Sequence, residues 1–296
     1  MLSGIGIVCF ASSYAIALVL ELTRLLFRSA IRGVLMLGWA GAGLFAHTMY
    51  LYHQAASGQG LPLSSERDWY LLAAWALAAV YLYLTYFHPQ TAFGPFLLPL
   101  VLALVGIAAF FADPHPYARE PASRVWGIIH GVSILLALVA ILVGFAAGLM
   151  YLHQAYRLKR KIVSRRGLRL PSLEWLHRAN SRAMVVAAIM LGMGLASGSI
   201  LILVRTTPPA LRLPWNDPLI LSTLLTFLWL AVSLCFTAFY KPLRQGPKVV
   251  YLTLVSLALL IVALGVGLSL QTAHRGGKSR SCIPQSSTFL PPSRPV

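Results

Sequence analysis

Apolar runs recur along the whole of this chain, and they constrain its fold more than any other feature. A run of about 20 predominantly apolar residues is long enough to cross the hydrocarbon core of a bilayer as a helix. Of the 296 residues, 58% are hydrophobic and only 10% are charged, whereas soluble domains carry about 25% charged residues. We therefore predict a polytopic membrane protein.

The fold class predicted from these runs is all-α. Backbone groups inside a bilayer must bond within a helix or around a closed barrel, and runs such as "LLPLVLALVGIAAFF" lack the alternation of barrel strands. The first run has no basic residue before it and no convincing cleavage site, so we expect it to be retained as a helix. Eight transmembrane helices are predicted, near residues 4–23, 33–53, 69–88, 93–112, 125–152, 183–204, 218–240 and 249–270.

Lys and Arg gather in alternate loops, and this predicts the orientation. The loops after the first, fifth and seventh runs hold fifteen of them, and the loops on the other side hold five. Cytoplasmic loops are enriched in Lys and Arg, so both termini are expected outside. The net charge of +17 is then a topology signal. Anionic lipids are its expected partner, and nucleic acid is not.

One transmembrane domain is expected over residues 1–274, and residues 275–296 are expected to form a disordered tail. The tail, "RGGKSRSCIPQSSTFLPPSRPV", is rich in Ser, Pro and Gly and has no periodicity. The three cysteines form no C-x-x-C or C-x-x-C-H pattern, which argues against a covalent haem site or a dithiol centre. Cys9 and Cys235 are expected to pack between helices.

Four features distant in the sequence are expected at one depth, in the outer third of the membrane. At 1.5 Å per residue, His47 lies roughly 10 Å below the outer end of its helix and His130 about 9 Å below the outer end of its own. His274 follows the last span and lies just outside. Trp215 and Asp217 belong to the outer turn that begins the seventh span.

Each of these residues also has a structural explanation. A histidine such as His47 or His130 can pack or pair with a neighbouring helix, and His274 can be an uninvolved surface residue. Asp217 can cap a helix whose first residue is proline, and Trp215 can belong to the interfacial aromatic belt. However, imidazoles from two segments can supply both axial ligands of a haem iron, so haem is the predicted cofactor.

Four sequence blocks, taken in order, support this prediction: "LFAHTMYLYHQAASGQGLPLSSERDWYLLAAWALAAVYL", "HPQTAFGPFLLPLVL", "WGIIHGVSILLALVAILVGFAAGLMYLHQAYRLKRK" and "LPSLEWLHRANSRAMVVAAIMLGMGLASGSI". Together they resemble the cytochrome c assembly (CcsA/HemX-like) family, over about residues 1–275. The resemblance implies that His130 and His274 are the outer axial haem ligands. His47 matches a recurring histidine of the early block. No inner haem site is implied, because "LRQGPK" stands where the family has an inner histidine.

The outer turn matches the family only in part. Trp215, Asp217 and Pro218 match its Trp-x-Trp-Asp-Pro segment, but Asn216 stands where the second Trp would be. Haem ligation by this chain itself, as a cytochrome c synthetase subunit, is therefore left open as an enzymatic role. The resemblance implies haem binding at the outer face and delivery to apocytochrome c. It further implies a second assembly-complex membrane subunit as partner and a bacterial cytoplasmic (inner) membrane as location.

Two other functions compete with haem delivery. A HemX-like regulator of tetrapyrrole biosynthesis would use the basic loop 157–182 as an interaction surface and perform no chemistry. A small-molecule transporter is disfavoured, because the chain shows no inverted repeat and Glu21 is the only acid near a membrane interior.

Overall fold

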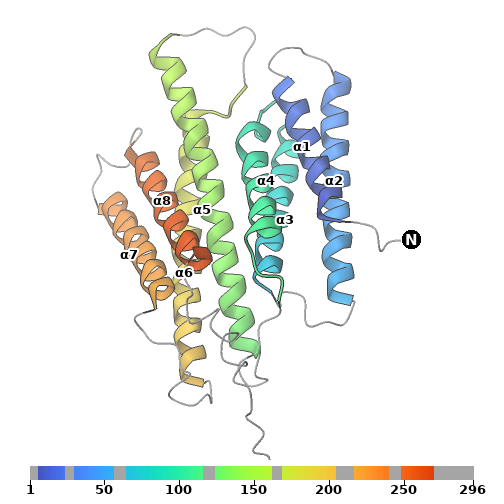
Figure 1. Cartoon of the computed structure of the whole chain (residues 1–296). Coiled ribbons are helices and arrows are strands. Elements are labelled where there is room, and N and C mark those ends of the chain that lie inside the picture. The colour runs from blue at the N-terminus through green and yellow to red at the C-terminus, as the bar shows by residue number, and fades with distance from the viewer. Residues whose placement is uncertain are drawn as a thin grey trace, which may run out of the picture.

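The computed structural model describes residues 6–23, 30–56, 65–115, 124–161, 169–204, 217–239 and 248–269. These residues form eight helices and no strand, so the predicted all-α class is confirmed (Figure 1). The helices are α1 (Ile7–Thr23), α2 (Ala30–Ala56), α3 (Glu66–Phe87), α4 (Gly94–Phe110), α5 (Arg124–Lys159), α6 (Leu173–Val204), α7 (Pro218–Phe239) and α8 (Lys248–Ser269).

The helices are those of a multi-pass membrane protein. Within the described residues, α2, α3, α5, α6 and α7 are long and apolar enough to cross a bilayer, and the apolar parts of α1, α4 and α8 are shorter. Eight crossings and external termini therefore stay predictions. One expectation was wrong: Cys9 on α1 and Cys235 on α7 are exposed, because each lies on a side of its helix that no neighbouring helix covers.

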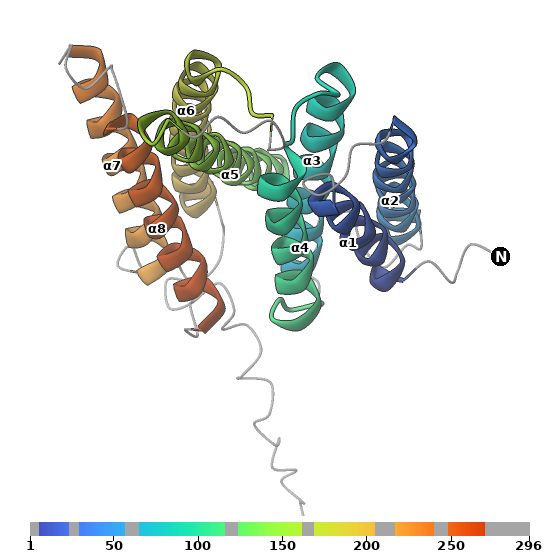
Figure 2. The ribbon, with the colours of Figure 1, turned by 90° about the horizontal axis from the view of Figure 1, so that it is seen from above.

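The eight helices divide into two groups that stand side by side (Figure 2). In the N-terminal group, α1 packs on α2 and α4, and α3 packs on α4 and α2. In the C-terminal group, α5 packs along α6 and α8, and α7 lies at the edge against α8 and α6. The two groups meet where α5 contacts α3 and α4. A residue on α2 and a residue on α5 are therefore separated by α3.

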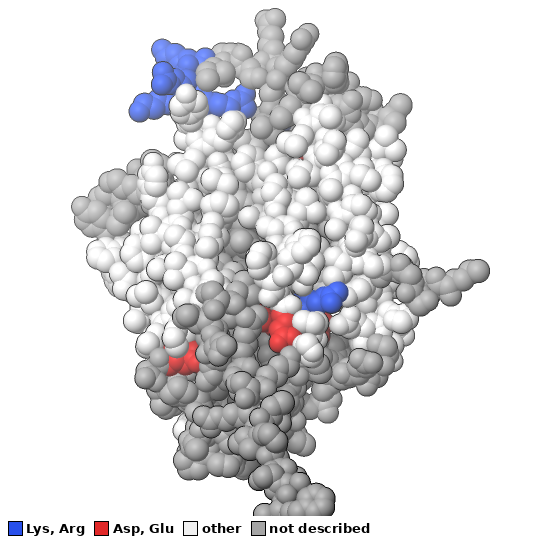
Figure 3. Space-filling model, in the orientation of Figure 1, with Lys and Arg blue, Asp and Glu red and all other residues white. Residues whose placement is uncertain are grey.

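Most charged side chains visible in Figure 3 lie at the two ends of the bundle, with Lys and Arg prevailing at one end and Asp and Glu at the other. We call one the basic end, after Arg157, Lys159, Arg160 and Lys161 at the close of α5, and the other the acidic end, after Glu66, Asp68, Asp113 and Asp217. Arg67 lies among the carboxylates, where its guanidinium donates to the Tyr50 hydroxyl at 3.1 Å. This separation matches the loop charges, which predict that the basic end faces the cytoplasm.

Helices α5 and α6 reach further toward the basic end than their apolar runs predicted. α5 has 36 residues, which corresponds to about 54 Å of helix, whereas the hydrocarbon core is about 30 Å thick. The additional turns are charged, and they include an exposed ion pair between Glu174 and Arg178 at 3.2 Å. Hydropathy marks only the part of a helix inside the membrane, and these two helices continue beyond it.

Polar contacts hold α2 against α3 near the acidic end. Ser65 and Asp68 form a reciprocal capping box at the start of α3. Gln54 of α2 donates to the Asp68 carboxylate at 2.9 Å. Further from the acidic end, the Trp75 indole of α3 donates to the Thr48 hydroxyl of α2 at 2.9 Å. These bonds fix α2 although much of its surface has no protein neighbour.

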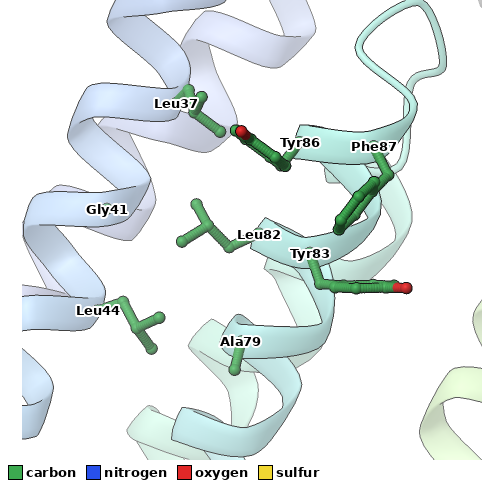
Figure 4. Close-up of a pocket in the computed structure, with 8 residues that line it drawn as sticks. All are labelled: Leu37, Gly41, Leu44, Ala79, Leu82, Tyr83, Tyr86 and Phe87. Carbon is green, nitrogen blue, oxygen red and sulfur yellow. The ribbon is translucent and has the colours of Figure 1, made fainter.

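An apolar groove of about 470 Å³ lies between α2 and α3 in the half of the bundle toward the basic end (Figure 4). In Figure 4, Tyr86 reaches across it toward Leu37. Its lining consists of Leu37, Gly41, Leu44, Ala79, Leu82, Tyr83, Tyr86 and Phe87. No histidine or charged side chain lines this groove, and the hydroxyls of Tyr83 and Tyr86 are the polar side-chain groups of its lining.

Candidate functional site

His130 lies in the second turn of α5 and bonds to the backbone of α6. Its Nδ1 is 2.7 Å from the carbonyl oxygen of Gly194. Because a carbonyl only accepts, Nδ1 carries the proton and donates it to this bond. In a neutral imidazole the acceptor lone pair then lies on Nε2. This tautomer is the one in which a histidine ligates a metal through Nε2 while a backbone carbonyl orients the ring.

The part of α6 that faces His130 is built from small residues. A Cβ at Gly198 would lie 3.0 Å from both Cε1 and Nδ1 of His130, and a Cβ at Gly194 would lie 2.6 Å from Cδ1 of Ile134. Ser197, between the two glycines, turns its hydroxyl back onto the Met193 carbonyl at 2.7 Å. Gly198 therefore leaves room for the imidazole and Gly194 leaves room for Ile134, so that α5 and α6 approach closely, as in other helix contacts of the G-x-x-x-G kind.

Helix α3 contributes a tryptophan beside the same turn of α5. The six-membered ring of Trp69 occupies the space that a side chain at Gly131 would need. Trp69 is partly buried and packs against the main apolar core. It therefore joins the N-terminal group of helices to α5 at the residue that follows His130.

Sequence reasoning did not single out Trp69, Gly194 or Gly198 as site residues. The run "GMGLASGS", residues 192–199, is a recognisable signal of close helix packing. Nothing in the sequence pairs Trp69 with α5, because that contact depends on how α3 and α5 meet.

His47 occupies a different place, in the contact between α1 and α2. It is fully buried, and its ring stacks on Phe10 with centroids 4.0 Å apart and planes 4° apart. The Tyr14 hydroxyl lies 3.4 Å from Nδ1, and Nε2 has no hydrogen-bond partner among the described residues. Because α3 stands between α2 and α5 (Figure 2), the described residues do not bring His47 and His130 into one pocket.

Asp217 caps α7, which was one of its two expected roles. Its Oδ1 accepts the Leu219 amide at 2.9 Å, its carbonyl accepts the Leu221 amide at 3.0 Å, and Pro218 is the first helical residue. The side chain is 3% exposed. The two other predicted site residues, Trp215 and His274, lie outside the described residues.

Replacement of Asp217 by alanine should destabilise α7, because the first turn loses its side-chain acceptor. We expect a loss of about 1 kcal/mol in the free energy of unfolding, measured by thermal unfolding in detergent. Asp217→Asn is the matched control, because asparagine caps as well as aspartate. If the asparagine variant were as unstable as the alanine variant, the negative charge and not the cap would be the stabilising feature.

A family model decides the identity of the chain. The model of the cytochrome C assembly protein family matches residues 66–274. The chain belongs to this family. Searches of curated proteins and of solved structures found no match.

Membership of the cytochrome c assembly family gives this multi-pass membrane protein a role in cytochrome c biogenesis. The family is associated with haem handling. The matched region contains α3 to α8, and with them His130 and Asp217, as well as Trp215 and His274. His47 and the α1–α2 pair precede it.

Proposed function

We propose that this protein binds haem at its acidic end and delivers it to apocytochrome c. The observation that carries the proposal is the bond from His130 Nδ1 to the Gly194 carbonyl. A bond of this kind fixes the tautomer and the ring orientation, and it raises the basicity of the other nitrogen. His130 is partly buried, as suits a ligand that must meet a large cofactor.

The remaining contacts to haem are proposed from the family resemblance. His274 would supply the second axial nitrogen and Trp215 an aromatic wall, while Asp217 would hold the turn that carries Trp215. His47 stays a candidate haem contact, but in the α1–α2 pair it would serve a site separate from that of His130. Haem would supply the iron and the vinyl groups that become joined to a cytochrome, and the chain would hold and orient it.

The charge separation supports the proposed orientation and partners. With the acidic end outside, the eight helices would cross a bacterial cytoplasmic membrane and present haem on the side where c-type cytochromes are completed. The basic end would face anionic lipids of the cytoplasmic leaflet, which attract clustered Lys and Arg. A second membrane subunit would complete the assembly complex.

Deletion of the gene tests this function against the regulatory alternative. If the protein delivers haem, holocytochrome c should fall severely while tetrapyrrole levels stay normal, and the intact gene should restore it. Haem staining of cytochromes and quantification of porphyrins in the same cells measure both. Normal holocytochrome c with altered tetrapyrroles would refute haem delivery and favour regulation. The family match itself favours assembly over regulation.

A further inference from the structure

A buried polar contact joins α6 to α8 on the side of the C-terminal group nearer the basic end. The Thr253 hydroxyl of α8 donates to Oδ1 of Asn180 on α6 at 2.7 Å, and it lies 3.2 Å from Sδ of Met184. Asn180 is 0% exposed and Thr253 1% exposed. A buried side-chain amide or hydroxyl needs a hydrogen-bond partner, so this pair restricts how α6 and α8 can pack against each other.

Two glycines of α5 make room for this contact. A Cβ at Gly144 would lie 3.5 Å from Asn180 Oδ1 and 3.5 Å from Cγ2 of Thr253, and a Cβ at Gly148 would lie 3.7 Å from Asn180 Nδ2. The contact between Asn180 and Thr253 therefore sits where α5, α6 and α8 meet.

Asn180 lies on the same face of α6 as Gly194, whose carbonyl bonds His130. Asn180, Met184, Ala187, Leu191 and Gly194 follow one another at spacings of four and three, which places them on one stripe of a helix. All five are buried. Asn180 bonds α8 at one end of the stripe, and Gly194 bonds His130 of α5 at the other.

Helix α8 needs such a contact because most of its other side chains are apolar and similar in shape. Its sequence is dominated by Leu, Val and Ala, and lipid tails provide no hydrophobic force that would select one packing register over another. The Trp229 indole of α7 also bonds α8, at 3.3 Å, but its acceptor is the Leu252 backbone carbonyl. Every residue has a backbone carbonyl, so a bond to one carbonyl could be replaced by a bond to the next after a shift of α8. The bond between Thr253 and Asn180 joins two particular side chains and would be lost in such a shift.

We propose that Asn180 and Thr253 are positioning residues that set the register of α8 against α5 and α6. The inference rests on the proposed function, because the register sets the height at which α8 ends at Ser269, the residue from which the chain leads to His274, the proposed second axial ligand. α6 would thus align α5, which carries His130, with α8, from which the chain leads to His274. A single buried polar pair fixes helix register in coiled coils in the same way.

A disulfide reporter tests the register without haem. A Cβ at Gly148 would lie 4.0 Å from the Val250 Cβ, within the range of about 3.5–4.5 Å that disulfides need. The reporter carries Gly148→Cys and Val250→Cys in a full-length chain whose native cysteines are serine. Thr253→Val should slow oxidative cross-linking about fivefold or more, a change within the strength of an interhelical hydrogen bond in a membrane.

Three further variants distinguish loss of this hydrogen bond from a general effect of substitution. Ser256→Ala is the matched control, because Ser256 is equally buried on α8 but, among the described residues, bonds within its own helix, at the Leu252 carbonyl. It should cross-link at the parent rate, and so should Thr253→Ser, which keeps the hydroxyl. Asn180→Leu should match Thr253→Val, and combining the two should slow the reaction no further. Cross-linking of Thr253→Val at the parent rate would overturn the proposal.

Haem spectra test whether the register of α8 affects haem binding. They are recorded on the same Thr253 and Ser256 variants, with the native residues kept at positions 148 and 250. Thr253→Val should lose the absorption spectrum of haem with two histidine ligands, and Ser256→Ala should keep it. An unchanged Thr253→Val spectrum, alongside slowed cross-linking, would overturn the link between register and haem. Absence of haem from the parent protein would instead refute the proposed function, and the cross-linking rates would still decide the register.

Discussion

Replacement of His130 by alanine is expected to remove nearly all haem that purifies with this protein. The variant loses the nitrogen that the Gly194 bond prepares for ligation. Loss of a residue that only supports a metal ligand typically costs 10- to 100-fold in metal affinity, so loss of the ligand itself should cost at least about 100-fold. The measurement is haem content per protein, together with the Soret absorption of the detergent-purified chain.

His53→Ala is the matched control for this change. His53 is an exposed histidine near the acidic end of α2, and it has no proposed role. Its replacement should leave the haem content unchanged. External imidazole should partly restore haem to His130→Ala, because it can enter the space left by the side chain. Full haem content in His130→Ala would mean that His130 is not a ligand.

Replacement of Gly198 by leucine is expected to lower haem content nearly as far, although His130 itself is intact. Even the Cβ would lie 3.0 Å from the imidazole, and the rest of the leucine side chain must displace the ring from the Gly194 carbonyl. Overpacking of this kind costs about 1–3 kcal/mol, and the lost orientation should reduce haem affinity about 10- to 100-fold. Haem titration of the apoprotein gives the affinity.

Gly106→Leu separates this effect from the general cost of replacing a helical glycine. Gly106 lies in α4, and a Cβ there would meet no atom within 4 Å. A leucine at this position should leave haem affinity and stability close to those of the parent. If Gly106→Leu and Gly198→Leu reduced haem affinity equally, the contact between Gly198 and His130 would not explain the loss.

The helical fold follows from the sequence because the bilayer permits few alternatives. All eight helices were expected near their observed positions, and the charge of the loops anticipated the two ends of the bundle. The starts of α5 and α7 agree within one residue, since both begin where an apolar run begins. The ends of α5 and α6 at the basic end were underestimated, because a helix in water carries polar residues such as Glu174 and Arg178 and leaves no apolar signal.

The candidate site was predictable only in part. The place of His130 in the second turn of its helix and the capping role of Asp217 follow from local sequence, because helix starts and cap chemistry are local properties. The partners of His130 do not, because the α6 carbonyl at Gly194 reaches it only through the packing of two helices. For the same reason the sequence placed His47 at a depth similar to that of His130 but gave no sign that α3 separates them.

The most direct test of haem ligation by His130 is pulsed electron paramagnetic resonance of the ferric haem-loaded protein. Histidine labelled with ¹⁵N should change the hyperfine coupling of both axial nitrogens, and His130→Ala, loaded with excess haem, should lose the coupling of one of them. Haem that shows no histidine coupling, or the same coupling in His130→Ala, would contradict the assignment of His130 as an iron ligand.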